Sequence, residues 1–102
     1  MRKVFIPNSL WYKIDEIKEY LIFELKLSEE AAENRINRME TFVYKLSNPV
    51  DYALCRFKKW RELGYRCAVF EKSWVFAYEI FENGVIVRDI SHTAELANTI
   101  DC

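Results

Sequence analysis

The sequence predicts an α+β fold in which an N-terminal strand and an antiparallel two-helix hairpin pack on a small, mainly antiparallel β-sheet. Apolar residues recur with a helical period in the first half of the 102-residue chain, and β-branched and aromatic residues dominate the second half. Asn83-Gly84 separates two of the strand-like segments, which is the strongest short signal for a β-hairpin. The expected order is β-α-α-β-β-β, in a single domain that covers residues 1–102.

The first predicted elements are a short strand and a helix. Residues 3–6 are β-prone and end at Pro7, after which Asn8 and Ser9 offer side chains that can cap a helix. The helix is indicated by apolar residues spaced three or four positions apart: Leu10, Ile14, Ile17, Leu21 and Leu25. Because the charged residues lie off this stripe, we expect one face of the helix to be buried.

A second helix follows closely. Ser28 is its predicted N-cap, and Glu29 and Glu30 suit the positive end of the helix dipole. Its apolar stripe consists of Ala32, Ile36, Met39, Val43 and Leu46. The helix is expected to end before Asn48-Pro49, and only Lys26-Leu27 separates the two stripes, which predicts an antiparallel hairpin.

Three strands are predicted in the second half, over residues 65–71, 74–81 and 85–90. The middle strand is apolar on both faces, which predicts a central position in the sheet. We expect its large residues to pack on the helices and its small ones, such as Val75 and Ala77, to line a shallow concave surface. Residues 93–99 are expected to form only a closing helical turn.

The charge is balanced overall but uneven along the chain. Fifteen basic and sixteen acidic residues give a net charge of −1, which argues against binding of nucleic acid by bulk charge. Residues 51–73 hold six basic and three acidic side chains, whereas residues 74–102 hold one basic and five acidic ones. Within residues 51–73, the cations alternate with aromatic rings, a pattern that suits single-stranded RNA. The alternative is a solvated loop whose aromatic residues anchor it to the core.

Cysteine usage indicates neither a disulfide framework nor a metal site. Cys55, Cys67 and Cys102 are odd in number and have no paired spacing, so we expect reduced thiols, with Cys55 and Cys67 partly buried. No metal or other cofactor is expected. No apolar run approaches the ~20 residues of a membrane helix, and the start lacks the apolar run of a signal peptide, so we expect a cytoplasmic protein that does not bind a membrane.

The strand motifs resemble those of one protein family. Tyr65-Arg66-Cys67-Ala68-Val69, then Trp74–Ile80, Val85–Val87 and His92, follow a two-helix half in an order similar to that of the RelE/ParE superfamily of bacterial type II toxins. This resemblance implies a cognate antitoxin as partner. For RelE-like members it also implies cleavage of mRNA on the ribosome, in which a ribose 2′-OH attacks the adjacent phosphate without a metal.

The resemblance and the residue chemistry together indicate a candidate catalytic site. Arg66 would clamp the phosphate, and His92 is the natural acid or base because histidine changes charge near neutral pH. Glu79 could accept a proton if it faces the same surface as Arg66. The candidate RNA-binding residues are Arg56, Lys58, Lys59, Arg61 and Tyr65.

Structural alternatives stay open for these residues. His92 is equally consistent with a capping or surface histidine, and Glu79 with a salt bridge to Arg66 or Arg88. Trp60, Trp74 and Tyr78 are assigned mainly to core packing.

Other functions within the family are also open. Ala68 and Val75 stand where RNA-cleaving members carry arginine, and Glu95 falls where many carry another. These differences favour a ParE-like toxin that inhibits DNA gyrase by protein contact. A homologue that has lost toxicity and only binds a partner is the third possibility.

Overall fold

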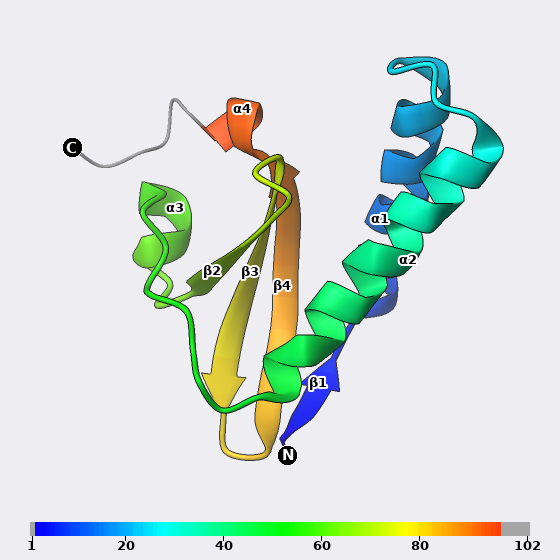
Figure 1. Ribbon diagram of the computed structural model, residues 1–102. Helices are drawn as coiled ribbons and strands as arrows, with labels where there is room; N and C mark the ends of the chain where they lie inside the picture. The colour runs from blue at the N-terminus through cyan, green and yellow to red at the C-terminus, as the bar shows by residue number, and fades with distance from the viewer. Residues whose placement is uncertain (1, 97–102) are drawn as a thin grey trace.

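The computed structural model describes residues 2–96 and confirms the α+β fold (Figure 1). A four-stranded sheet has the order β1-β4-β3-β2. The elements in chain order are β1 (Lys3–Phe5), α1 (Asn8–Phe23), α2 (Glu29–Tyr44), the 3-10 turn η1 (Lys45–Ser47), α3 (Lys58–Arg61), β2 (Arg66–Phe70), β3 (Trp74–Phe81), β4 (Gly84–His92) and α4 (Thr93–Leu96). Of the closing turn predicted over residues 93–99, α4 is confirmed, and residues 97–99 lie outside the described part of the chain.

The sheet is mainly antiparallel, as predicted, with β3 in a central position. β3 pairs antiparallel with both β2 and β4, whereas β1 pairs parallel with β4. Gly84 lies opposite Lys3, and a Cβ atom at this position would collide with the Lys3 carbonyl, so glycine allows β1 to approach. The register shifts after Ala77, which leaves Arg88 as an extra residue in β4.

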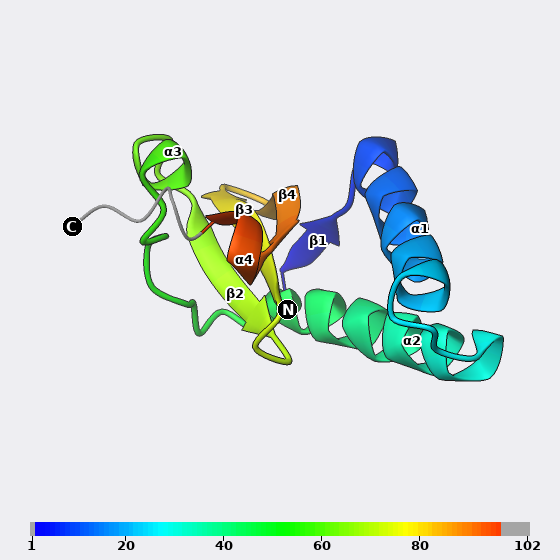
Figure 2. The ribbon, with the colours of Figure 1, turned by 90° about the horizontal axis from the view of Figure 1, so that it is seen from above.

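The helical hairpin covers one face of the sheet (Figures 1 and 2). Both predicted stripes are buried in one core with Phe76, Tyr78 and other residues of the sheet, except that Leu25 is 49% exposed because α1 ends at Phe23. Ser28 caps α2 as predicted, and its Oγ accepts a hydrogen bond from the Ala31 amide at 3.1 Å.

The predicted cap of the first helix is wrong. Asn8 and Ser9 lie inside the first turn of α1, and Pro7 occupies the N-cap position without a side-chain hydrogen bond. The Pro7 carbonyl accepts from the Leu10 amide at 2.9 Å. The fixed φ of proline, here −61°, lets the chain turn directly from β1 into the helix.

Residues 48–65, the crossing segment, connect η1 to β2 and carry α3 onto the opposite face of the sheet (Figure 2). There Trp60 is only 3% exposed and packs in a second cluster with Cys55, Val75 and Ala77. The predicted concave surface over Val75 and Ala77 is therefore wrong, because the crossing segment fills it. The core assignments of Trp60, Trp74 and Tyr78 are confirmed.

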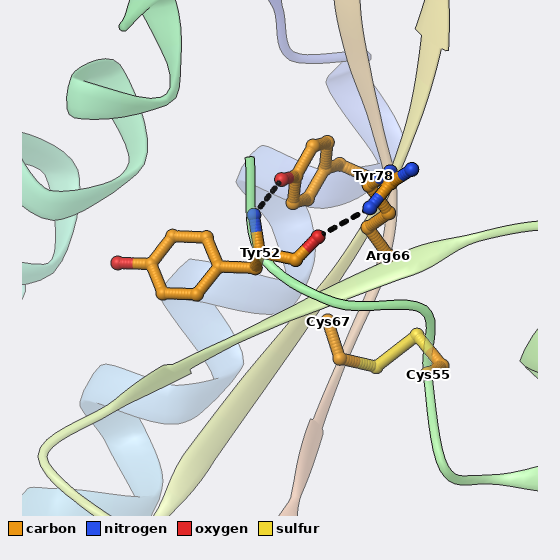
Figure 3. The surroundings of a disulfide bond; sticks show 5 residues. All are labelled: Tyr52, Cys55, Arg66, Cys67 and Tyr78. Carbon is orange, nitrogen blue, oxygen red and sulfur yellow. Dashed lines mark hydrogen bonds between the residues drawn. A yellow bond between two sulfur atoms is a disulfide. The ribbon is translucent and has the colours of Figure 1, made fainter. Parts of the chain in front are cut away.

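Cys55 and Cys67 form a disulfide, so the expectation of two reduced thiols is wrong (Figure 3). A β-bridge between Leu54 and Arg66 brings the two cysteines side by side, with their Cα atoms 4.8 Å apart. Cys102 lies outside the described residues.

Residues 2–96 contain neither a membrane-spanning helix nor a cluster of possible metal ligands. No helix in this part of the chain combines the length and apolar content that crossing a membrane requires. Nor do three or more His, Cys, Asp or Glu side chains gather there as a possible metal site.

Candidate functional site

Arg66 joins the crossing segment to β2, the strand that it begins. It begins β2 opposite Tyr78, and its Nη1 donates a hydrogen bond to the Tyr52 carbonyl at 2.6 Å (Figure 3). The Tyr52 amide in turn donates to the Tyr78 hydroxyl at 3.0 Å. The guanidinium that was predicted to clamp a phosphate therefore makes a structural contact in the described chain.

A polar network continues from Tyr78 to the N-terminus. The Tyr78 hydroxyl donates to Asp51 at 3.1 Å, and Asp51 accepts two hydrogen bonds from the Arg2 guanidinium. Arg2 Nε also donates to the Leu46 carbonyl at 3.0 Å. This network ties β1, η1, the crossing segment and β3 together.

Electrostatics within the network follow from these contacts. The hydrogen bond from Arg2 lowers the pKa of Asp51 below its ordinary value, against the opposing effect of burial. The same contact raises the pKa of the Arg2 guanidinium. Burial raises the pKa of the Tyr78 hydroxyl, which therefore stays protonated and available as a donor.

Glu79 lies on the other face of the sheet from Arg66. Alternation along β3 directs Tyr78 to the helical face and Glu79 to the opposite face. Glu79 accepts from Arg88 Nη2 at 2.7 Å and from Nε at 3.0 Å. The salt bridge to Arg88 is thus confirmed, and a shared surface with Arg66 is excluded.

His92 ends β4 opposite Trp74, the first residue of β3, whereas Arg66 pairs with Tyr78 in the middle of β3. Its ring meets the Trp74 ring edge to face, with centroids 4.9 Å apart. Its Nδ1 accepts a hydrogen bond from the Ala94 amide at 3.1 Å, which confirms the capping alternative. With Nδ1 as the acceptor, the neutral ring carries its proton on Nε2.

An open pocket of ≈ 590 Å³ surrounds His92, between α1 and the end of β4; we call it the end pocket. Its lining includes three basic groups, Lys13, Lys59 and His92, and two acidic ones, Glu16 and Asp89. Lys13 forms an ion pair with Asp89, whose Oδ1 also accepts from the Ile90 amide at 2.8 Å. This pocket can therefore hold a polar group between cations that come from α1 and from the crossing segment.

The predicted RNA-binding residues point in different directions. In α3, Trp60 is buried, while Lys59 lines the end pocket with its Nζ 5.0 Å from the centre of the Trp60 ring. Lys58 is exposed and lies 4.0 Å from Glu62, and Tyr65 packs partly buried in the second cluster. Arg56 and Arg61 are exposed.

The three predicted catalytic residues do not converge. On β3, the partners of Arg66 and His92 are Tyr78 and Trp74, four residues or about 13 Å apart along the strand. Arg66 and His92 also sit on different strands, with β3 between them. Of the predicted site residues, the structure brings only His92 and Lys59 to one pocket.

Two features escaped the sequence analysis. The disulfide had no spacing signal, although the 12-residue separation is compatible with a closed loop. Lys13 lies off the buried stripe of α1, and its place one turn before Ile17 is the clue in the sequence that it lies beside the buried face.

Comparison with known protein families, with curated proteins and with solved structures finds no match to this chain.

Proposed function

We propose that this chain is the toxin of a type II toxin–antitoxin module, acts in the cytoplasm and is neutralised by a cognate antitoxin. One observation carries the proposal: the two RelE/ParE-like motifs, residues 65–69 and 74–80, lie on adjacent antiparallel strands of a sheet that an N-terminal helical hairpin covers. That arrangement is what the resemblance implies for the family fold.

The geometry favours a toxin that acts by contact with a protein target, and the ParE resemblance implies DNA gyrase. Cleavage of RNA needs a base, cations and an acid around one phosphate. Here Arg66 bonds to the Tyr52 carbonyl, Glu79 is paired with Arg88, and His92 lies at the end of β4, with β3 between it and Arg66. Their dispersal supports a mechanism without nuclease chemistry.

A second candidate function is supported by the end pocket. His92, Lys59 and Lys13 line it together with the carboxylates Glu16 and Asp89, and Lys13 is paired with Asp89. A phosphate of mRNA bound there would therefore meet the Lys59 ammonium and the His92 imidazole, and Lys13 only if its ion pair with Asp89 opens. The lining of the end pocket supports a ribosome-dependent endoribonuclease. Its active groups would include His92 from the predicted catalytic residues, but not Arg66 or Glu79.

Induction of the protein in a bacterial host separates these functions. Growth arrest with intact transcripts, altered DNA supercoiling and an SOS response would support gyrase inhibition. Growth arrest with cleaved transcripts and unchanged supercoiling would support the endoribonuclease. Unimpaired growth at verified expression would overturn both and leave a non-toxic binding homologue.

Two matched variants test whether the end pocket takes part in RNA cleavage. Lys59→Ala and Lys58→Ala remove lysines from the same helical turn, but only Lys59 lines the pocket. If the pocket cleaves RNA, Lys59→Ala and His92→Ala reduce transcript cleavage about 10- to 100-fold, and Lys58→Ala changes it less than about 3-fold. Equal effects of the two lysine variants would remove the pocket from the mechanism.

A further inference from the structure

The disulfide closes a loop, residues 55–67, that contains α3 and all four basic residues of the crossing segment; we call it the disulfide loop. We propose that Cys55–Cys67 is a reversible redox site whose reduction by a dithiol releases the disulfide loop from the sheet and withdraws Lys59 from the end pocket. The proposal rests on how the loop is anchored, on its charge and on its position beside the pocket.

Besides the disulfide, the loop is anchored by hydrogen bonds at its two ends, including that of Arg66 to the Tyr52 carbonyl, and by one buried side chain. Backbone hydrogen bonds join the Cys55 amide to the Tyr65 carbonyl at 2.9 Å and the Cys67 amide to the Ala53 carbonyl at 3.3 Å. Trp60 supplies the buried side chain, with Phe57 and Tyr65 packed partly against the same cluster. α3 has only four residues, and a single helical turn is not stable by itself in water.

The loop also carries charge that opposes its own compaction. Residues 56–66 contain five basic side chains and one acidic one, Glu62. Like charges on a short closed segment repel one another, and the repulsion is relieved when the segment extends into solvent. Breaking the covalent closure therefore releases a segment that is poorly held and internally repelled.

The two cysteine residues differ in exposure, and we infer the direction of the exchange from this difference. Cys55 is 1% exposed, whereas Cys67 is only partly buried, so an external thiolate attacks Cys67 Sγ. The Cys55–Cys67 bond breaks, the Cys55 sulfur leaves as a thiolate, and a mixed disulfide forms on Cys67. The second thiol of the reductant then displaces Cys67, both cysteines take up protons, and the dithiol becomes a disulfide after a two-electron transfer.

The link to the end pocket is Lys59. It lies four residues from Cys55, within the closed loop, yet it lines the same pocket as His92, which belongs to β4. The disulfide therefore helps to fix one of the pocket's cations relative to a rigid strand. Release of the loop removes that cation and uncovers Val75 and Ala77 beneath Trp60.

The role of this redox site in the cell rests on the proposed function. The exchange chemistry of the disulfide does not depend on that function. Disulfides in the reducing cytoplasm are usually transient and redox-sensing. A cytoplasmic toxin with this pair would have its disulfide loop closed under oxidising stress and released in the reduced cell.

Limited trypsin digestion of the full chain tests the proposal independently of toxicity. Trypsin cleaves after Arg56, Lys58, Lys59 and Arg61, so the digestion rate reports directly on opening of the loop. One sample is oxidised with oxidised glutathione; another is reduced with dithiothreitol, which is removed under argon before digestion. Mass spectrometry follows cleavage at each site, and cleavage after Lys26, in the connection between α1 and α2, serves as the internal control.

The expected result is that reduction accelerates cleavage within residues 56–61 about tenfold or more and leaves cleavage after Lys26 unchanged. Cys102→Ser should behave as the wild type, and the Cys55→Ser/Cys67→Ser double variant should be cleaved rapidly whether or not dithiothreitol has been applied. Equal rates in both redox states overturn the proposal. So does an equal acceleration after Lys26, because that indicates global unfolding, and so does alkylation of Cys55 and Cys67 in the oxidised sample.

Discussion

The two faces of the sheet are buried in contrasting ways. On one face, α1 and α2 supply sixteen residues each and a continuous apolar core. On the other face, a crossing segment with a single helical turn relies on Trp60 and a disulfide. The same strand, β3, contributes Phe76 to the first face and Val75 to the second.

This contrast shows two physical routes to a buried strand. Amphipathic helices distribute their contacts over many turns, so the helices and the sheet share one continuous core and lose stability together. A loop can cover a strand only with a large side chain and a constraint on its ends, because its backbone forms few regular hydrogen bonds. Damage to the loop face should therefore stay local, whereas damage to the helical face should destabilise the whole domain.

The largest expected effect comes from the helical face. Phe76→Ala removes a ring that is 1% exposed, and we expect the free energy of unfolding to fall by about 3–5 kcal/mol because a cavity forms in the main core. Urea denaturation measures this change. Phe5→Ala, at a ring that is 42% exposed on the opposite face, should cost less than about 1 kcal/mol; a similar loss at both sites would contradict the contrast.

Trp60→Ala should produce the next largest effect: we expect the free energy of local opening of the disulfide loop to fall by about 3 kcal/mol, with a different pattern of exposure. Hydrogen exchange should accelerate in residues 55–67 and in the part of β3 that Trp60 covers, while the amides of α1 and α2 keep their protection. Uniform loss of protection across the domain would show that the loop face is as integral to global stability as the helical face.

Disruption of the polar network around Asp51 should lower the free energy of unfolding by an intermediate amount that depends on pH. Asp51→Asn leaves the partly buried Arg2 guanidinium without its carboxylate partner. We expect the free energy of unfolding at pH 7 to fall by about 2 kcal/mol. Thermal unfolding of both proteins from pH 7 to pH 3 measures it.

The sign of the pH dependence follows from the lowered pKa of Asp51. Because the folded-state pKa lies below the unfolded value of about 3.9, the stabilisation is fully present above that value. It is lost as the pH falls from about 4 through the folded-state pKa. The difference between wild type and Asp51→Asn should therefore shrink toward pH 3, and a constant difference would exclude this carboxylate as its source.

The smallest predicted effect tests the two helix starts. Ser28→Ala removes the hydrogen bond to the Ala31 amide and should cost about 1 kcal/mol. Ser9→Ala should change stability by less than about 0.5 kcal/mol, because Pro7 and not Ser9 lies at the start of α1. Chemical denaturation compares the two; a larger loss at Ser9 would contradict the structure of the first turn.

The regular elements were predictable because their patterns are local. The stripes of α1 and α2 repeat over several turns, and Asn83-Gly84 marks the β3–β4 hairpin directly. α3 was not predictable, since four residues are too few to show a period.

The candidate site was only partly predictable, because its geometry depends on long-range pairing. Arg66 and His92 were correctly placed near strand ends, but their separation follows from the register of both with β3. Arg2 and Asp51 lie 49 residues apart, and nothing in the local sequence links them. The disulfide likewise depends on the Leu54–Arg66 bridge, which no spacing rule reveals.

The parallel pairing of β1 with β4 has a consequence for synthesis of the protein. Val4 pairs with Val85, so β1 has no partner in the sheet until β4, about 80 residues later, has been translated. At roughly 5–20 residues per second, that interval lasts several seconds. During it the helical hairpin can already form, because its contacts are close in sequence, while β1 stays an unpaired edge. Closure of the sheet by β1 is thus a late event that follows synthesis of β4.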